Sequence, residues 1–226
     1  MDIQKEEEHK ELSVEEVKFK MIQDEFYKGI DAVSKFNPSV TFYGSTHLDE
    51  KSEYYQKVKH LAYRIAKELG YAVLSGGGPG IMEAANKGAY EAGGKSVGLT
   101  IKLPEEQLSN KYLTNEIPFH YFFTRQSSMS FSTEVCIFCP GGYGTLNELF
   151  EILTLEQTNK IGRIPVILFC SEFWKPLEKL TNEILLERFH TIAKEDTQIY
   201  TIMDDEDEIL NMIKNSKMRY GDDSLI

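Results

Sequence analysis

The segment that decides the fold is VCIFCPGGYGTLNELFEILTLEQ, residues 135–157. It begins with the apolar run 135–139, which has the length and the side chains of a buried β-strand. The glycine-rich turn 140–145 follows directly, and residues 146–157 then carry apolar side chains at helical spacing. A strand, a tight turn and a helix in this order predict one unit of an α/β protein.

The same arrangement recurs upstream, where VTFY precedes GST (44–46) and YAVLS precedes GGGPG (76–80). Strands that alternate with helices predict a mostly parallel sheet, and nearly continuous apolar strands indicate a sheet covered on both faces. The sequence therefore predicts an α/β fold with about seven strands flanked by helices. The expected strands are the β-branched or aromatic runs 40–43, 71–75, 96–101, 118–123, 135–139, 165–169 and 199–203.

Residues 1–36 are expected to form a charged N-terminal extension that contains a helix. Its first 13 residues are strongly charged and are expected to be frayed, and residues 14–36 repeat apolar side chains at loose helical spacing. We expect this helix to pack on the main domain or on a partner chain. Residues 37–226 show no internal repeat and are predicted to form one domain, with a short helix and a frayed end after residue 204.

Charge and composition restrict the partners. The 226 residues contain 25 Lys and Arg against 36 Asp and Glu, a formal net charge of −11. Nucleic acid polymers and anionic membranes attract proteins that neutralise phosphates, so neither is an expected partner. The N-terminus has no apolar signal region, and the longest apolar run, 166–170, is too short to span a membrane. With only three cysteines, the chain is expected to be cytoplasmic and reduced.

The three glycine-rich turns are candidate anion sites, because open parallel sheets bind ligands at the carboxyl ends of their strands. Glycine lets backbone N–H groups approach an anion, and the start of the following helix adds partial positive charge. Tight turns alone would also explain the glycines, but three such turns in one sheet favour a phosphate-bearing ligand. The candidate phosphate-binding residues are Gly44, Ser45, Gly76, Gly77, Gly78, Gly80, Gly141, Gly142, Tyr143, Gly144 and Thr145.

Other motifs are excluded by their context. The turn 76–81 is not the dinucleotide-binding motif G-x-G-x-x-G, because Ile81 stands where the last glycine belongs. Cys136 and Cys139 have the spacing of a metal or redox pair, but residues three apart in a strand point to opposite faces. We therefore expect both to pack in the core. The five histidines show no ligand spacing, so no metal is implied. No cofactor is expected either.

The nine residues PGGYGTLNE, 140–148, match completely the signature P-G-G-x-G-T-x-x-E of the Lonely guy (LOG) family. These proteins are cytokinin-activating phosphoribohydrolases that were once described as possible lysine decarboxylases. The segment FFTRQSSMS resembles a second element of the family, with Arg125 at its arginine position and Gln126 where lysine is usual. The resemblance extends from residue 40 to residue 169 and implies a Rossmann-like fold and a homodimer or an assembly of dimers.

The resemblance also implies an activity, the hydrolysis of the N-glycosidic bond of a nucleoside 5′-monophosphate to a free base and ribose 5-phosphate. The substrate would be AMP-like or a cytokinin riboside monophosphate. By position, Arg125 and Glu148 would be the catalytic residues, and Thr154 would lie close to the nucleotide. Because Gln126 is uncharged, a second positive charge and a cytokinin preference are not carried over. The residues that would cradle the phosphate are Gly141, Gly142, Gly144 and Thr145.

A carboxylate beside the ribose suits this reaction. Breaking a ribosyl–base bond builds positive charge on the sugar, which a carboxylate stabilises while it orients or deprotonates water. We expect Glu148 on the first turn of its helix, just beyond the bound phosphate. The pattern Thr145-x-x-Glu148 is also that of a capping box, in which the glutamate bonds the N–H of the cap residue. Arg125 would bind the phosphate or orient the carboxylate.

Two other functions stay open at this point. A non-catalytic carrier of a nucleotide or a phosphorylated cofactor, such as the related molybdenum-cofactor carriers, would use the same turns. Such a carrier needs no carboxylate near an anionic ligand, so Arg125 and Glu148 together favour an enzyme. A nucleosidase of broad base preference that serves purine turnover would share the site, and its base pocket would distinguish it.

Overall fold

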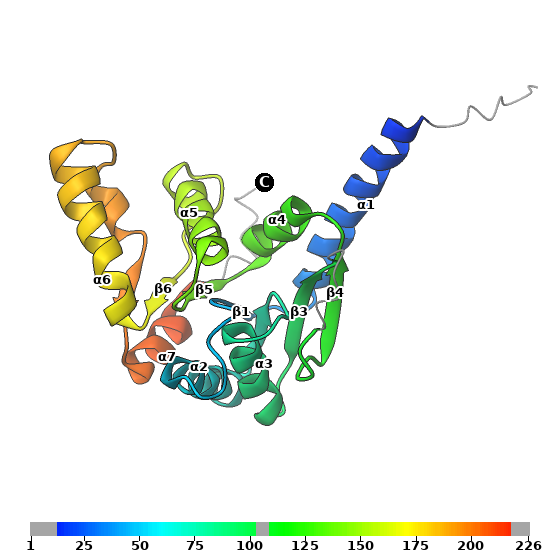
Figure 1. Ribbon diagram of the computed structural model, residues 1–226, viewed down its shortest axis with the longest axis horizontal. Coiled ribbons are helices and arrows are strands. Elements are labelled where there is room, and N and C mark those ends of the chain that lie inside the picture. The colour runs from blue at the N-terminus through cyan, green and yellow to red at the C-terminus, as the bar shows by residue number, and fades with distance from the viewer. Residues whose placement is uncertain (1–12, 103–108, 218–226) are drawn as a thin grey trace, which may run out of the picture.

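The computed structural model describes residues 13–102 and 109–217 (Figure 1). At its centre is a seven-stranded sheet with the order β4-β3-β2-β1-β5-β6-β7, in which every neighbouring pair is parallel. The expected α/β, Rossmann-like fold is therefore confirmed. The strands are β1 Ser39–Tyr43, β2 Ala72–Ser75, β3 Ser96–Ile101, β4 Asn115–Phe119, β5 Val135–Phe138, β6 Val166–Phe169 and β7 Thr201–Met203.

Helices cover both faces of the sheet (Figure 1). One core lies between the sheet and α2, α3 and α7, and the other between the sheet and α1, α4, α5 and α6. Two π-helical segments, Ile65–Leu69 and Leu180–Arg188, extend α2 and α6, and a 3-10 helix, Lys194–Gln198, precedes β7. The helices are α1 Val14–Ser34, α2 Glu53–Arg64, α3 Ile81–Glu91, α4 Phe122–Ser132, α5 Tyr143–Gln157, α6 Ser171–Lys179 and α7 Glu206–Asn215.

The cysteine pair at the end of β5 packs as the strand geometry predicts. Cys136 lies in the core on the α4 and α5 side, and Cys139 lies in the core on the α2 and α3 side. Both are buried, and neither forms a disulfide within the described residues.

The strand expected over 118–123 is wrong in its bounds. The structure places β4 at Asn115–Phe119, and α4 begins at Phe122. The strand is at the edge of the sheet and its first residues, Asn115 and Glu116, are exposed, so it lacks the apolar pattern of a buried strand. The aromatic run that suggested a strand continues into the first turn of α4, where Phe122 and Phe123 are exposed.

Both chain ends were expected to be frayed. The N-terminal one falls largely on residues 1–12 and the C-terminal one on residues 218–226, and these two ranges lie outside the described residues. The tail helix expected after residue 204 is α7. Within the described ranges, none of the helices combines the length and the apolar character needed to cross a bilayer.

The strand order reverses direction between β1 and β5. From β1 the chain proceeds through β2 and β3 to β4 on one side, and from β5 through β6 to β7 on the other. At such a point the connections leave the two strands in opposite directions and open a crevice at their carboxyl ends. The adjacent strands β2, β1 and β5 are the three that glycine-rich turns follow, so the topology brings all three turns to this crevice.

Candidate active site

The three glycine-rich turns line a common cavity of about 340 Å³. A smaller hollow of about 190 Å³ adjoins it and shares Thr46, Gly76, Met82 and Arg125 with it. Of the residues expected from the sequence, the structure brings Gly44, Ser45, Gly76, Arg125, Gly142, Tyr143, Gly144, Thr145 and Glu148 to the larger cavity. Gly77 and Gly78 line the smaller hollow.

Three expected residues lie outside both hollows. Gly80 has a left-handed φ of 71°, and a Cβ there would lie 2.3 Å from the carbonyl oxygen of Ser45, so it packs the second turn against the first. Gly141 lines a separate groove that includes Tyr54 and Phe173. Thr154 is exposed near the far end of α5, where its hydroxyl donates to the carbonyl of Phe150.

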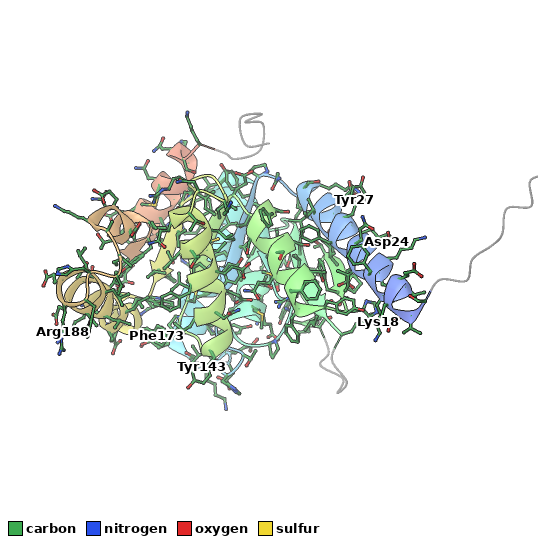
Figure 2. The ribbon with its side chains drawn as sticks, turned by 90° about the horizontal axis from the view of Figure 1, so that it is seen from above. Lys18, Asp24, Tyr27, Tyr143, Phe173 and Arg188 are labelled. Atoms are coloured by element: carbon green, nitrogen blue, oxygen red, sulfur yellow. The ribbon has the colours of Figure 1, made fainter. Side chains whose placement is uncertain are left out.

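The start of α5 differs from the expected capping box. The helix begins at Tyr143, its N-cap is Gly142, and no side chain within the described residues caps it. Thr145 is consequently the third helical residue, and Glu148 lies on the second turn instead of the first. Tyr143 is 93% exposed and stands at the start of the helix (Figure 2).

This helix end is open to the cavity. Apart from their chain neighbours and the backbone of the helix itself, no atom of the described residues lies within 4 Å of a Cβ built at Gly142 or Gly144. The first N–H groups of a helix lack intrahelical partners and carry partial positive charge. The first turn of α5 therefore offers backbone N–H groups to an anion at the cavity, which the side chains of Tyr143 and Thr145 also line.

Arg125 and Glu148 both line the cavity, and Nη2 of the arginine lies 4.0 Å from Oε1 of the glutamate. Their side chains are 12% and 19% exposed, so the charges interact in a largely dry environment. The guanidinium has two further close neighbours, Leu99 and Gly76. Its Nε donates to the carbonyl of Leu99 on β3 at 2.7 Å, and a Cβ at Gly76 would lie 2.4 Å from Nη2. Gly76 therefore provides the space that the guanidinium occupies.

Burial raises the pKa of Glu148 to about 7, against an opposing effect of the Arg125 charge and with a further upward contribution from Glu151. A carboxyl group with this pKa exchanges a proton readily near neutral pH, which suits general acid–base chemistry. The phenol of Tyr43 lines the same cavity and stacks on Phe138 with a 4.5 Å centroid separation. Its burial raises its pKa well above the ordinary value, so it stays neutral.

Sequence reasoning missed several residues of this region. Met82 lines both hollows, and no chemical motif marks it. Thr46, the last residue of the first glycine-rich turn, also lines both. His47, which directly follows the first glycine-rich turn, also lines the larger cavity. Gln126, the departure from the family pattern, donates a hydrogen bond to Glu151 one turn beyond Glu148.

A family model described as "Possible lysine decarboxylase" matches residues 82–213, more than half of the chain. The chain belongs to this LOG-type family. The matched residues include Arg125, Glu148 and the turn before α5, and the turns that follow β1 and β2 lie N-terminal to them.

Solved structures share the fold of this LOG-type protein. TM1055 is 23% identical with a TM-score of 0.57, over 79% of this chain and 99% of that one. The molybdenum cofactor carrier protein MCP from Chlamydomonas reinhardtii is 22% identical with a TM-score of 0.57, over 78% and 96%. The molybdenum cofactor binding protein from the phototrophic bacterium Rippkaea orientalis is 22% identical with a TM-score of 0.55, over 78% and 93%. No curated protein matches the chain.

Proposed function

We propose that this LOG-type protein hydrolyses the N-glycosidic bond of nucleoside 5′-monophosphates and releases a free base and ribose 5-phosphate. The observation that carries the proposal is the buried pair of Arg125 and Glu148, 4.0 Å apart, in a cavity that also contains the open N-terminus of α5. One end of this cavity offers backbone N–H groups to a phosphate, and the other offers a carboxylate to the sugar.

The reaction follows from this placement. With the 5′-phosphate on the first turn of α5, the attached ribose reaches the second turn, where Glu148 lies. As the C1′–N bond breaks, the ionised carboxylate stabilises positive charge on the ribose and accepts a proton from the attacking water. The oxygen of that water bonds to C1′ and keeps one hydrogen, and the base leaves with the bonding electrons. The proton that Glu148 accepted then passes to the base, directly or through solvent water, which restores the carboxylate. Arg125 binds the phosphate or orients the carboxylate.

A carrier of a phosphorylated cofactor is the second candidate, because two of the structural neighbours are named as molybdenum cofactor carrier or binding proteins. The glycine-rich turns would serve such a ligand equally well. The buried carboxylate argues for the enzyme. A carrier makes no use of a carboxylate in this cavity, whereas hydrolysis needs one to stabilise positive charge on the ribose.

A panel of nucleoside monophosphates separates the two candidates. We expect the purified protein to release free base and ribose 5-phosphate in equal amounts from at least one member, measured by chromatography. The same panel ranks the bases and so distinguishes a broad nucleosidase from one that prefers a modified adenine. Saturable binding of a nucleotide with no product from any member of the panel would favour the carrier.

We also propose that the protein assembles at least as a homodimer. Phe122, Phe123 and Phe131 on α4 and Phe150 on α5 are between 43% and 60% exposed, and large exposed apolar side chains favour association. Light scattering at micromolar concentration should give at least twice the chain mass of 25.9 kDa. A mass of one chain under these conditions would contradict this proposal and leave the hydrolase assignment untouched.

A further inference from the structure

We propose that Glu25, on the N-terminal helix α1, is a positioning residue that fixes the start of α4 and so holds Arg125 against Glu148. The inference rests on the role assigned above to the Arg125 and Glu148 pair. Helix α1 runs beside α4 at the β4 edge of the sheet in both views (Figures 1 and 2). Residue 25 is one hundred positions from Arg125 in the sequence.

The carboxylate of Glu25 accepts hydrogen bonds from the segment that begins α4. Its Oε2 lies 2.8 Å from the backbone N of His120 and 2.9 Å from the ring nitrogen Nδ1 of the same residue. Its Oε1 lies 3.1 Å from the backbone N of Tyr121 and 2.5 Å from the hydroxyl of Thr124. Tyr121 is the N-cap of α4 and supplies no side-chain cap, and Glu25 accepts the N–H of this cap residue from a different helix.

The side chain of Glu25 is 12% exposed, yet its pKa is lowered. Burial alone would raise the pKa, and the hydrogen bonds from Thr124, His120 and Tyr121 outweigh that effect. The group is therefore ionised at neutral pH. A carboxylate at a helix N-terminus also interacts favourably with the helix dipole, which strengthens the attachment of α1 to α4.

The bonds to Glu25 reach the backbone turn from which Arg125 projects. The hydroxyl of Thr124, which has one proton to donate, lies within hydrogen-bond distance of both Glu25 and the carbonyl of Tyr121, and the N–H of Arg125 donates to that same carbonyl. One turn further along α1, a Cβ at Gly29 would lie 2.5 Å from the hydroxyl oxygen of Ser128 on α4. The two helices therefore approach closely along adjacent turns, and Glu25 sets where α4 begins.

Arg125 has little room to adapt to a shift of α4. Its guanidinium occupies the space left by Gly76 and is bonded to the carbonyl of Leu99. Because the backbone of Arg125 belongs to α4, a displacement of the helix start strains these contacts and moves the guanidinium relative to Glu148. Misplacement by about 1 Å can cost on the order of a hundredfold in rate. Glu25 therefore maintains the distance between Arg125 and Glu148, although it contacts neither of them.

Two measurements on Glu25→Gln test this inference. Glutamine keeps the size but places an amide nitrogen against groups that donate hydrogen bonds, so α4 should shift at its start. We expect kcat to fall about tenfold or more, with KM nearly unchanged. Titration of the ¹³C-labelled glutamate carboxyls by NMR should show the pKa of Glu148 rising by about half a unit or more as Arg125 moves away.

Asp24→Asn is the matched control. It removes the same charge from the neighbouring position of α1, and Asp24 is exposed and takes part in none of the contacts described for Glu25 (Figure 2). Glu25 lies in a surface cavity that Asp24, Lys28, Glu116 and His120 also line. Because Asp24 shares this charged environment, Asp24→Asn shows how much of any effect comes from the loss of one negative charge there. We expect Asp24→Asn to change neither kcat nor the pKa of Glu148.

The NMR titration needs no turnover, so failure of this inference is distinct from failure of the proposed reaction. A Glu25→Gln protein with lower thermal stability but an unchanged pKa at Glu148 would overturn the positioning role. Should that variant fail to fold, Thr124→Val removes the hydroxyl that bonds Glu25 and the Tyr121 carbonyl while keeping the shape of the side chain. It is expected to give the same upward shift of the pKa, and an unchanged pKa would likewise overturn the inference.

Discussion

Replacing Glu148 by glutamine should lower the turnover of a nucleoside monophosphate at least about a hundredfold, because an amide cannot stabilise positive charge on the ribose or accept the proton of water. Nucleotide binding should be largely kept, since the turns that face the phosphate are unchanged. The substitution does not disturb the start of α5, because Gly142 and not Thr145 is the N-cap. The measurements are the rate of base release and the nucleotide Kd for both proteins.

Glu151→Gln is the matched control for this variant. Glu151 lies one turn further along α5 and is also a partly buried carboxyl whose pKa is raised, yet it does not line the cavity. We expect only a small change in turnover. Near-normal turnover of Glu148→Gln would remove Glu148 from the mechanism and favour the carrier function.

Glu148→Gln should also stabilise the folded protein at alkaline pH. The pKa of Glu148 rises on folding from 4.5 to about 7, so the folded protein binds this proton more tightly than the unfolded chain does. Stability associated with this group is complete below pH 4.5 and is lost as the pH rises through about 7. Glutamine avoids the loss, which corresponds to at most about 3 kcal/mol. The Tm of Glu148→Gln should therefore exceed that of wild type by several degrees at pH 8, and the difference should shrink towards pH 5.

The protein should hydrolyse AMP at least about a hundredfold more efficiently than adenosine, measured as kcat/KM. Two charge-assisted hydrogen bonds from the first turn of α5 to the phosphate contribute about 1.5 kcal/mol each, which together correspond to this factor. Because the phosphate is remote from the reacting bond, its binding positions the ribose against Glu148. Adenosine with added inorganic phosphate is the control for an effect of the free anion. Equal efficiency on AMP and adenosine would contradict the assignment of the turns to phosphate.

Much of the fold could be predicted from local sequence. Strands that are buried on both faces are apolar throughout, so the runs that became β1, β2, β5 and β6 stand out from the helices between them. The edge strand β4 was misplaced because its exposed first half gives no apolar signal. The strand order depends on pairings between distant segments, such as Val40 with Val135, and no local pattern encodes them.

The parts of the candidate site that carry a recognisable local sequence pattern could be predicted. Glycine-rich turns after strands indicated the cavity, and the nine-residue signature indicated Glu148. The start of α5 was misjudged because glycines at 142 and 144 are poor helix formers, so the helix seemed to begin later. The contribution of Glu25 could not be foreseen, since an acidic residue on a charged helix looks solvent-exposed until α4 is placed beside it.

The central claim is that this cavity breaks a glycosidic bond, and the most direct test is to incubate the protein with AMP and quantify adenine and ribose 5-phosphate together. We predict that wild type forms the two products in a one-to-one ratio, with multiple turnovers, and that Glu148→Gln binds AMP but forms them at least about a hundredfold more slowly. Binding of AMP by both proteins without release of adenine by either would contradict the claim.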